Sequence, residues 1–122
     1  MVPQAKPLTN LDIRCAEAGQ QLSDIKGIDE KVLNEALAVL EEQGPYAMFL
    51  YIKARHKGLS CEFQRACMGL LENVFGQETL ANKDALQVIA KLADDLDDLL
   101  FARDLLRNAL GYARYHLKTR AE

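Results

Sequence analysis

Apolar residues recur at steps of three and four along most of the chain, and this spacing is the feature that most constrains the fold. Between residues 11 and 25, for example, the apolar positions are separated by four, three, four and three residues. No segment shows the alternation of a half-buried strand or a run rich in β-branched residues. At 122 residues the chain can bury one core but not two. The sequence therefore predicts an all-α fold, a compact bundle of five or six helices, in a single domain of residues 1–122.

Capping residues divide this pattern into separate helices. Thr9 and Asp12 resemble a capping box at the start of the first helix. Asp29 can cap a second helix, and Gly44 followed by Pro45 is typical of the end of one helix and the start of the next. The other expected boundaries are Gly27 after the first helix, Gly58 after the third, Ser60 as the cap of the fourth, Gly76 at its end, Asn82 as the cap of the fifth, and Thr119 near the end of the last.

The third of these segments is unusual, because it is apolar on every side of a helix. It begins at Gly44 and has no polar face that could be exposed to solvent before Lys53, the first of several basic residues. Arg55, His56 and Lys57 follow at once. We expect this helix to run through the middle of the bundle and to present its basic end at the surface.

Composition excludes several classes of protein. Hydrophobic residues make up 49% and charged residues 27%, as in folded domains rather than disordered ones. The first ten residues lack the apolar core of a secretory signal, and no apolar run approaches the roughly 20 residues of a membrane span. We therefore expect a cytoplasmic protein with no membrane contact. Cys15, Cys61 and Cys67 form no C-x-x-C pair, and all three are interpreted as small core residues.

Signatures of catalysis are missing from the sequence. No glycine-rich phosphate loop is present, and no Ser/His/Asp or Cys/His grouping can be identified. His56 and His116 are the only histidines, and His116 falls within the apolar arc of the last helix, where a satisfied core or interface histidine is the usual case. The sequence predicts a protein that is not an enzyme and has no catalytic residue, metal or cofactor.

An acidic run offers the main alternative to that conclusion. Asp94, Asp95 and Asp98 match a D-D-x-x-D pattern, whose carboxylates lie one helical turn apart and could hold Mg²⁺ against a diphosphate. Enzymes of that kind need a second acidic cluster on a facing helix and a large apolar cavity. The other reading is a solvated junction, because Asp is a poor interior residue of a helix but a good N-cap. The acidic residues that do not supply a matching second motif are Glu41, Glu42, Glu62 and Glu72.

The last helix carries a narrow basic stripe, which we call the basic ridge: Arg103, Arg107, Arg114 and Lys118. Measured from Arg103 at 100° per residue, the other three lie at about 40°, 20° and 60°. The ridge is roughly 22 Å long, and its guanidinium groups can bind phosphates bidentately. Since the formal net charge is −3, nucleic-acid binding would require such a local patch. A solvated face partly paired with acids such as Asp104 is the alternative. The opposite face is apolar and is expected to dock on the bundle.

Two blocks of the sequence resemble a known family. The first reads EEQGPYAMFLYIKARHKG (residues 41–58) and resembles the glycine-led apolar helix in the small subunit of type III CRISPR effector complexes, the Cmr type (type III-B) in particular. The second reads LLFARDLLRNALGYARYHLK (residues 99–118) and resembles the closing helix of that family. Chain length and helix order agree between the two blocks, so the resemblance spans most of the chain.

This resemblance implies a non-enzymatic subunit of an antiviral CRISPR-Cas ribonucleoprotein. Several copies would stack head to tail beside the backbone subunits, which bind crRNA, and beside the large subunit, and would line the groove that holds single-stranded target RNA. Such a subunit contacts RNA phosphates without reading bases, in keeping with a protein that must accept any sequence. The matching RNA-binding positions are Arg103, Arg107, Arg114 and Lys118 in the last helix, then Lys53, Arg55 and Lys57, with Arg14 as a weaker candidate.

A second function class stays open beside this one. A helical adaptor that binds only protein could use exposed aromatic residues as contact patches and the arginines of the ridge to meet acidic partners. The Mg²⁺-dependent diphosphate enzyme is the third possibility. The aromatic residues concerned are Tyr46, Tyr51, Tyr112 and Tyr115.

Overall fold

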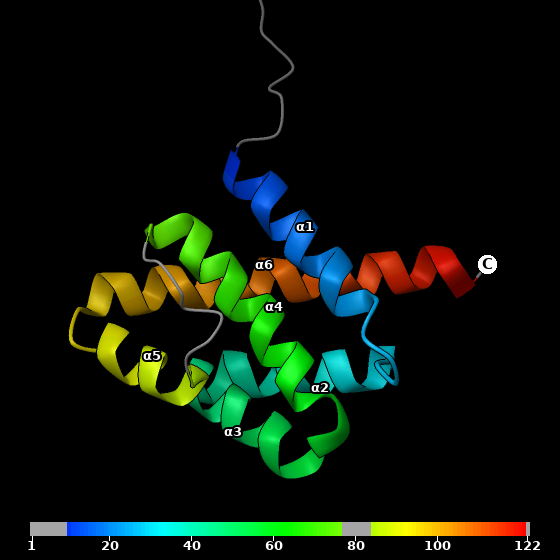
Figure 1. Ribbon diagram of the computed structural model, residues 1–122, viewed down its shortest axis with the longest axis horizontal. Coiled ribbons are helices and arrows are strands. Elements are labelled where there is room, and N and C mark those ends of the chain that lie inside the picture. Colours follow the sequence, from blue (N-terminus) through cyan, green and yellow to red (C-terminus); the bar gives the residue numbers. More distant parts are fainter. Residues whose placement is uncertain (1–9, 77–83, 122) are drawn as a thin grey trace, which may run out of the picture.

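The computed structural model describes residues 10–76 and 84–121, which form an all-α bundle (Figure 1). Its helices are α1 (Asn10–Ser23), α2 (Glu30–Gln43), α3 (Pro45–Arg55), α4 (Lys57–Phe75), α5 (Ala85–Leu92) and α6 (Leu96–Ala121). These described residues contain six helices and no strand, which confirms the predicted fold class. None of these six helices combines the length and apolarity that crossing a bilayer requires. The predicted caps Thr9 and Asn82 lie outside the described residues.

Helix α6 is the element on which the other helices pack. It contacts all five of them, and Figure 1 shows it running along the long axis of the molecule while α1 and α4 cross it. Its buried face confirms the apolar stripe expected for the last helix. The buried residues of this face are Ala102, Leu105, Leu106, Ala109, Leu110 and Ala113.

The prediction that the third helix runs through the middle of the bundle is wrong. In α3, Tyr46 and Leu50 are 46% and 48% exposed, while Met48, Phe49 and Ile52 are buried. Helix α3 packs mainly on α2, α5 and α4, so that one side faces water. A short helix without a polar face gives no signal of which side is buried. The longer stripe of α6 can bury more apolar area, and α6 takes the central place.

Small residues allow α1 and α6 to approach closely. A Cβ atom at Gly19 would lie 2.6 Å from Cβ of Tyr112 and 2.8 Å from the carbonyl oxygen of Ala109. One turn earlier in α1, the Cys15 thiol donates to the carbonyl oxygen of Leu105 at 3.7 Å. Glycine is therefore required at position 19 by packing and not by backbone conformation.

The three cysteines do not share one environment. Burial, with a smaller contribution from Asp12, raises the pKa of Cys15 to about 11, and burial also raises the pKa of Cys67. Both are inert core residues, as expected. Cys61, however, is exposed on α4, so its assignment to the core was wrong. It occupies a solvent-facing position of a helix whose buried stripe passes through Leu59 and Phe63.

Several helix boundaries follow the predicted capping signals. The Asp29 carboxylate accepts a hydrogen bond from the backbone N–H of Val32 at 2.9 Å, so it caps α2. Gly44 ends α2 with a φ of 97°, a conformation that favours glycine, and Pro45 is the first residue of α3. Gly76 ends α4 in the left-handed conformation, with a φ of 71°.

The predicted boundary between the third and fourth helices is two to four residues off. Helix α3 ends before His56, and α4 begins at Lys57, so Gly58 and Ser60 both lie inside α4 rather than at its edges. His56 breaks the helical path with φ −134° and ψ 56°. Its ring packs edge-on against Tyr51, with ring centroids 5.7 Å apart. The chain therefore turns at His56, two residues before the glycine that the sequence indicated.

That corner is tied to α2 through Glu35. The Tyr51 hydroxyl donates to the Glu35 carboxylate, and Nε2 of His56 lies 3.6 Å from the same carboxylate oxygen. The hydrogen bond from Tyr51 is the largest cause that lowers the pKa of Glu35 below its ordinary 4.5, and the same bond raises the pKa of Tyr51. One carboxylate thus joins α2 to the end of α3 and the start of α4.

The close approach at Gly19 can be tested with a matched pair of substitutions. Gly19→Ala is expected to lower the free energy of unfolding by about 1–3 kcal/mol, because its Cβ would overlap the backbone of α6. Gly69→Ala, in α4, meets nothing within 4 Å and should instead raise it by about 0.5–1 kcal/mol. Denaturant unfolding measures both. Equal effects of the two substitutions would contradict the packing argument.

The Glu35 contact predicts a specific acid sensitivity. Because the folded-state pKa of Glu35 is lowered, its stabilising contribution is complete above pH 4.5 and is lost as the pH falls through the folded-state pKa. Glu35→Gln should therefore be less stable than the wild type at neutral pH, and the difference should shrink in acid. Thermal unfolding at several pH values measures this, with Glu42→Gln on the same helix as the control. A difference that does not vary with pH would contradict the assignment.

Candidate functional site

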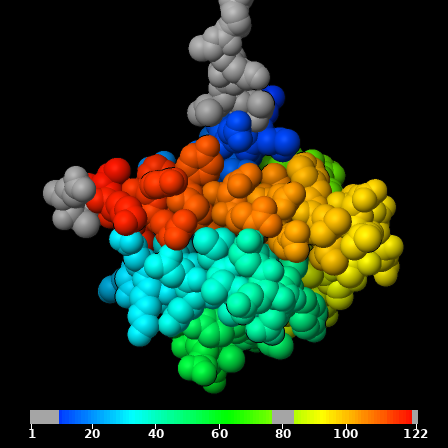
Figure 2. Space-filling model, turned by 180° about the vertical axis from the view of Figure 1, so that it is seen from behind, coloured from blue at the N-terminus to red at the C-terminus, as the bar shows by residue number. Residues whose placement is uncertain are grey.

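The basic ridge lies along α2, where it forms a polar seam between the two helices. Lys118 Nζ is 3.6 Å from a carboxylate oxygen of Glu30. Further along, Arg114 Nη1 donates to Oδ1 of Asn34 at 2.9 Å, and the Arg107 guanidinium binds Glu41. Figure 2 shows α6, in orange to red, lying against α2, in cyan to teal, across one whole face of the molecule.

The contacts follow one antiparallel register. Between the first two pairs, α2 advances by four residues, from Glu30 to Asn34, and α6 goes back by four, from Lys118 to Arg114. Between the second and third pairs, α2 advances by seven residues, from Asn34 to Glu41, and α6 goes back by seven, from Arg114 to Arg107. Within this interval the same register places Leu37 of α2 opposite Gly111 of α6. The seam therefore has a position where α6 contributes no side chain.

The cations of the ridge differ in how well they are neutralised. Arg107 binds Glu41 and also Asp104, which lies 3.0 Å away, and the hydrogen bond that Arg107 donates to Glu41 is the largest cause that raises the pKa of Arg107. Arg114 has only the neutral Asn34 as a hydrogen-bond partner among the described residues, and its Nε is buried without a partner there. Arg103 Nε is likewise buried and unpaired in that part of the chain. The positive charge of Arg114 is thus the one at the centre of the seam that no described carboxylate neutralises.

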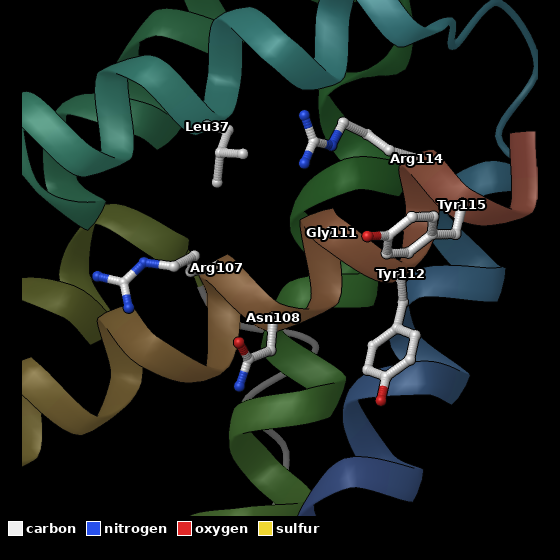
Figure 3. A pocket seen from close by; sticks show the side chains of 7 residues that line it. All are labelled: Leu37, Arg107, Asn108, Gly111, Tyr112, Arg114 and Tyr115. Atoms are coloured by element: carbon white, nitrogen blue, oxygen red, sulfur yellow. The ribbon is translucent and has the colours of Figure 1, made fainter. Parts of the chain in front are cut away.

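A hollow of about 310 Å³ opens at the centre of the seam, above the missing side chain of Gly111 (Figure 3). Figure 3 shows Arg107 and Arg114 extending from α6 on either side of Leu37 and Tyr115 reaching back toward Gly111. Tyr115 is 66% exposed, so most of its ring surface is free. The residues that line the hollow are Leu37, Arg107, Asn108, Gly111, Tyr112, Arg114 and Tyr115.

This set of groups is suited to binding rather than to acid–base or nucleophilic chemistry. Guanidinium groups bind phosphates, and tyrosine rings offer a face on which a planar group can stack. Among the described residues, neither a histidine nor a carboxylate lines the hollow. Arg107 and Arg114 were predicted from the sequence, whereas Asn108, Leu37 and Gly111 were missed. The one available signal was a glycine in the interior of a long helix, between two of the predicted arginines.

The remaining RNA-binding candidates lie elsewhere. Lys53 and Arg55 end α3 and Lys57 begins α4, and all three are exposed. Figures 1 and 2 show this corner on the far side of α2 from α6. Arg14 is exposed on α1 and lies 3.4 Å from Glu17, one turn later. The structure therefore brings three predicted cations of the ridge, Arg107, Arg114 and Lys118, onto α2. The cations at the corner between α3 and α4 and Arg14 on α1 lie away from the seam.

The acidic run forms the junction between α5 and α6. Oδ1 of Asp95 accepts hydrogen bonds from the backbone N–H groups of Asp97 and Asp98, at 2.9 and 3.2 Å, so Asp95 acts as a helix cap. Asp94 is exposed between the two helices. In residues 10–76 and 84–121, no three His, Cys, Asp or Glu side chains are grouped so that they could hold a metal ion. This arrangement matches the solvated junction that was the alternative to a diphosphate site.

Comparison with known proteins identifies no relative. No protein-family model matches the chain, and no curated protein or solved structure is significantly similar to it. The seam, the hollow and the resemblance in the sequence are therefore the grounds on which a function can be proposed.

Proposed function

We propose that this protein is a non-enzymatic structural subunit of a type III CRISPR-Cas ribonucleoprotein and that it binds RNA through the seam of α6. The observation that carries the proposal is the hollow, where two arginines of the predicted ridge and the exposed ring of Tyr115 come together on α6. A positive groove lined with aromatic rings is the usual construction of a surface that binds single-stranded nucleic acid. The resemblance of residues 41–58 and 99–118 supports the same assignment.

The ion pairs of the seam are compatible with RNA binding. Glu41 and Arg107 have side chains 47% and 36% exposed, and exposed pairs of this kind contribute only about 0–1 kcal/mol. A phosphate can replace such a carboxylate at little cost. Arg114 needs no exchange, because its partner Asn34 is neutral. Each copy would make a few phosphate contacts, so binding should be weak for one copy and stronger when several copies are arrayed along a strand.

The proposed partners are target RNA, the crRNA-containing complex with its backbone and large subunits, and further copies of this chain. Head-to-tail stacking needs two different complementary patches on each copy. The exposed cations Lys53 and Lys57 provide a basic patch, and the exposed carboxylates of residues 94–97 provide an acidic one. These two patches support the proposal of stacked copies.

A protein-binding adaptor without RNA is the second candidate function. It is favoured by the fact that Arg107 and Lys118 already bind carboxylates of α2. It is also favoured by exposed apolar side chains such as Tyr46, Leu50 and Leu96, which could contact another protein.

The proposed RNA contact can be tested with the double substitution Arg107→Gln/Arg114→Gln. Binding of a fluorescently labelled single-stranded RNA, followed by anisotropy over a salt series, should weaken by roughly tenfold or more. The slope of log affinity against log salt should fall by about 0.7 for each phosphate that the variant no longer binds. The decrease should be the same for two unrelated RNA sequences, because the arginines bind phosphates and not bases.

The matched control is Lys26→Gln/Lys91→Gln, which removes the same charge at exposed positions that do not line the hollow. It should bind RNA almost as the wild type does. Equal decreases in the two double variants would point to bulk charge rather than to the seam. A wild-type chain that binds neither RNA at low salt would overturn the proposal in favour of the adaptor.

Glu41 should compete with phosphate for Arg107. Glu41→Gln removes the carboxylate that binds this guanidinium, so RNA affinity is expected to rise several-fold. Glu42→Gln changes the net charge equally at the neighbouring exposed position and makes no contact with Arg107 among the described residues. The same anisotropy titration compares them. If both variants show the same rise in affinity, the specific competition is refuted.

A further inference from the structure

Gly111 is a glycine that packing does not explain. A Cβ atom at this position would meet nothing within 4 Å, and no positive φ is present that would require glycine. Gly19, by contrast, is needed for the contact between α1 and α6. A glycine inside a helix lowers stability relative to alanine. The effect of Gly111 on the surface is to open the hollow, and this suggests a role in binding.

The neighbours of Gly111 on α6 are arranged around that opening. Side chains on a helix lean toward its N-terminus, so Tyr115 covers the turn that contains Gly111. Figure 3 shows the Tyr115 ring reaching back toward Gly111, with Arg114 on the side of α2. Leu37 of α2 forms an apolar wall opposite. A flat group entering above Gly111 would therefore meet an aromatic ring on one side and an aliphatic side chain on another.

The size of the hollow restricts what can enter. About 310 Å³ lies at the lower end of the range for small-molecule sites, which is roughly 300–1,000 Å³. A volume of this size corresponds to one planar ring system rather than to several. The charge beside it is positive, because Arg114 lacks a carboxylate partner among the described residues. A planar group that carries a phosphate fits this combination.

We propose that the hollow above Gly111 is a subsite for one nucleotide, whose base stacks on Tyr115 and whose phosphate is bound by Arg114. The inference rests on the proposed RNA binding and goes beyond it, because phosphate contacts alone would not involve the base. Stacking on an aromatic ring accepts every base, so the subsite keeps the tolerance for sequence that the proposed function requires. A nucleotide within an RNA strand and a free nucleotide share this chemistry, and the experiment separates the two.

Filling the hollow provides the test. Gly111→Leu puts an aliphatic side chain into open space, where it can pack against Leu37, so the variant should fold at least as well as the wild type. Gly69→Leu, another glycine inside a helix with open space at Cβ, is the matched control. Thermal unfolding verifies that both variants are folded. RNA binding by Gly111→Leu should be roughly tenfold weaker, and that by the control should match the wild type.

Two further comparisons identify the base as the group that is bound. A short single-stranded RNA should bind the wild type more tightly than an abasic ribose-phosphate strand of equal length, and Gly111→Leu should lose this preference. Tyr115→Leu should lose it as well, whereas Tyr115→Phe, which keeps the ring, should retain more of it than Tyr115→Leu does.

Each failure has a distinct meaning. If the wild type binds neither strand, the proposed function fails together with the subsite. If it binds both strands equally, or if Gly111→Leu binds RNA as the wild type does, the subsite is refuted and phosphate binding stands. Adenosine monophosphate should displace the labelled RNA only at much higher concentration than unlabelled RNA does. Displacement at equal concentrations would overturn the assignment to a strand in favour of a free nucleotide.

Discussion

The close approach of α1 and α6 at Gly19 is the constraint on which the rest of the molecule depends. With Cβ of Tyr112 and the backbone of α6 so near, α6 has little freedom to rotate about its own axis. The rotational position of α6 that this contact fixes directs the stripe from Ala102 to Ala113 into the core. Arg120 holds the far end of α6, since it donates to the carbonyl oxygen of Ser23 and to Asp24 at 2.9 and 2.7 Å. The direction in which the basic ridge points is thus a consequence of apolar packing on the other side of the helix.

The side chains of helix α2 determine which cations of the basic ridge are neutralised. Its carboxylates bind two cations of the ridge, Lys118 at Glu30 and Arg107 at Glu41, but between these two pairs the seam has only the neutral Asn34 among the described residues. At the same place α6 has Gly111 in place of a side chain. Charge and space are therefore available together at one point, while the flanking ion pairs stabilise the register that creates it. A ridge with uniform partners along its length would offer no such point.

The features that could be predicted from the sequence are those governed by neighbours along the chain. Asp29 caps its helix, and Gly44 and Gly76 end theirs, because backbone geometry and a hydrogen bond within four residues determine these roles. The corner at His56 was misplaced, and one of the contacts of this residue, with Glu35 on another helix, cannot be read from neighbours along the chain. Likewise, the wheel that grouped Arg107 and Arg114 could not place their partners, which lie 66 and 80 positions away in the sequence. Helical periodicity predicts which residues share one face of a helix, but the residues that pack against this face are known only from the folded structure.

The incomplete neutralisation of the seam fits a subunit that must hold a strand without reading it. Arginines fully exposed to water would bind any polyanion, and arginines held in buried ion pairs would be costly to release. Exposed carboxylate partners give an intermediate case, because a phosphate replaces them with little net change in free energy. Under the proposed function each copy would contribute only a small affinity, and selectivity for a long strand would arise from the number of aligned copies. The unneutralised charge of Arg114 would then determine where on each copy the strand is held, and the acidic side chains of α2 would limit how tightly it is bound.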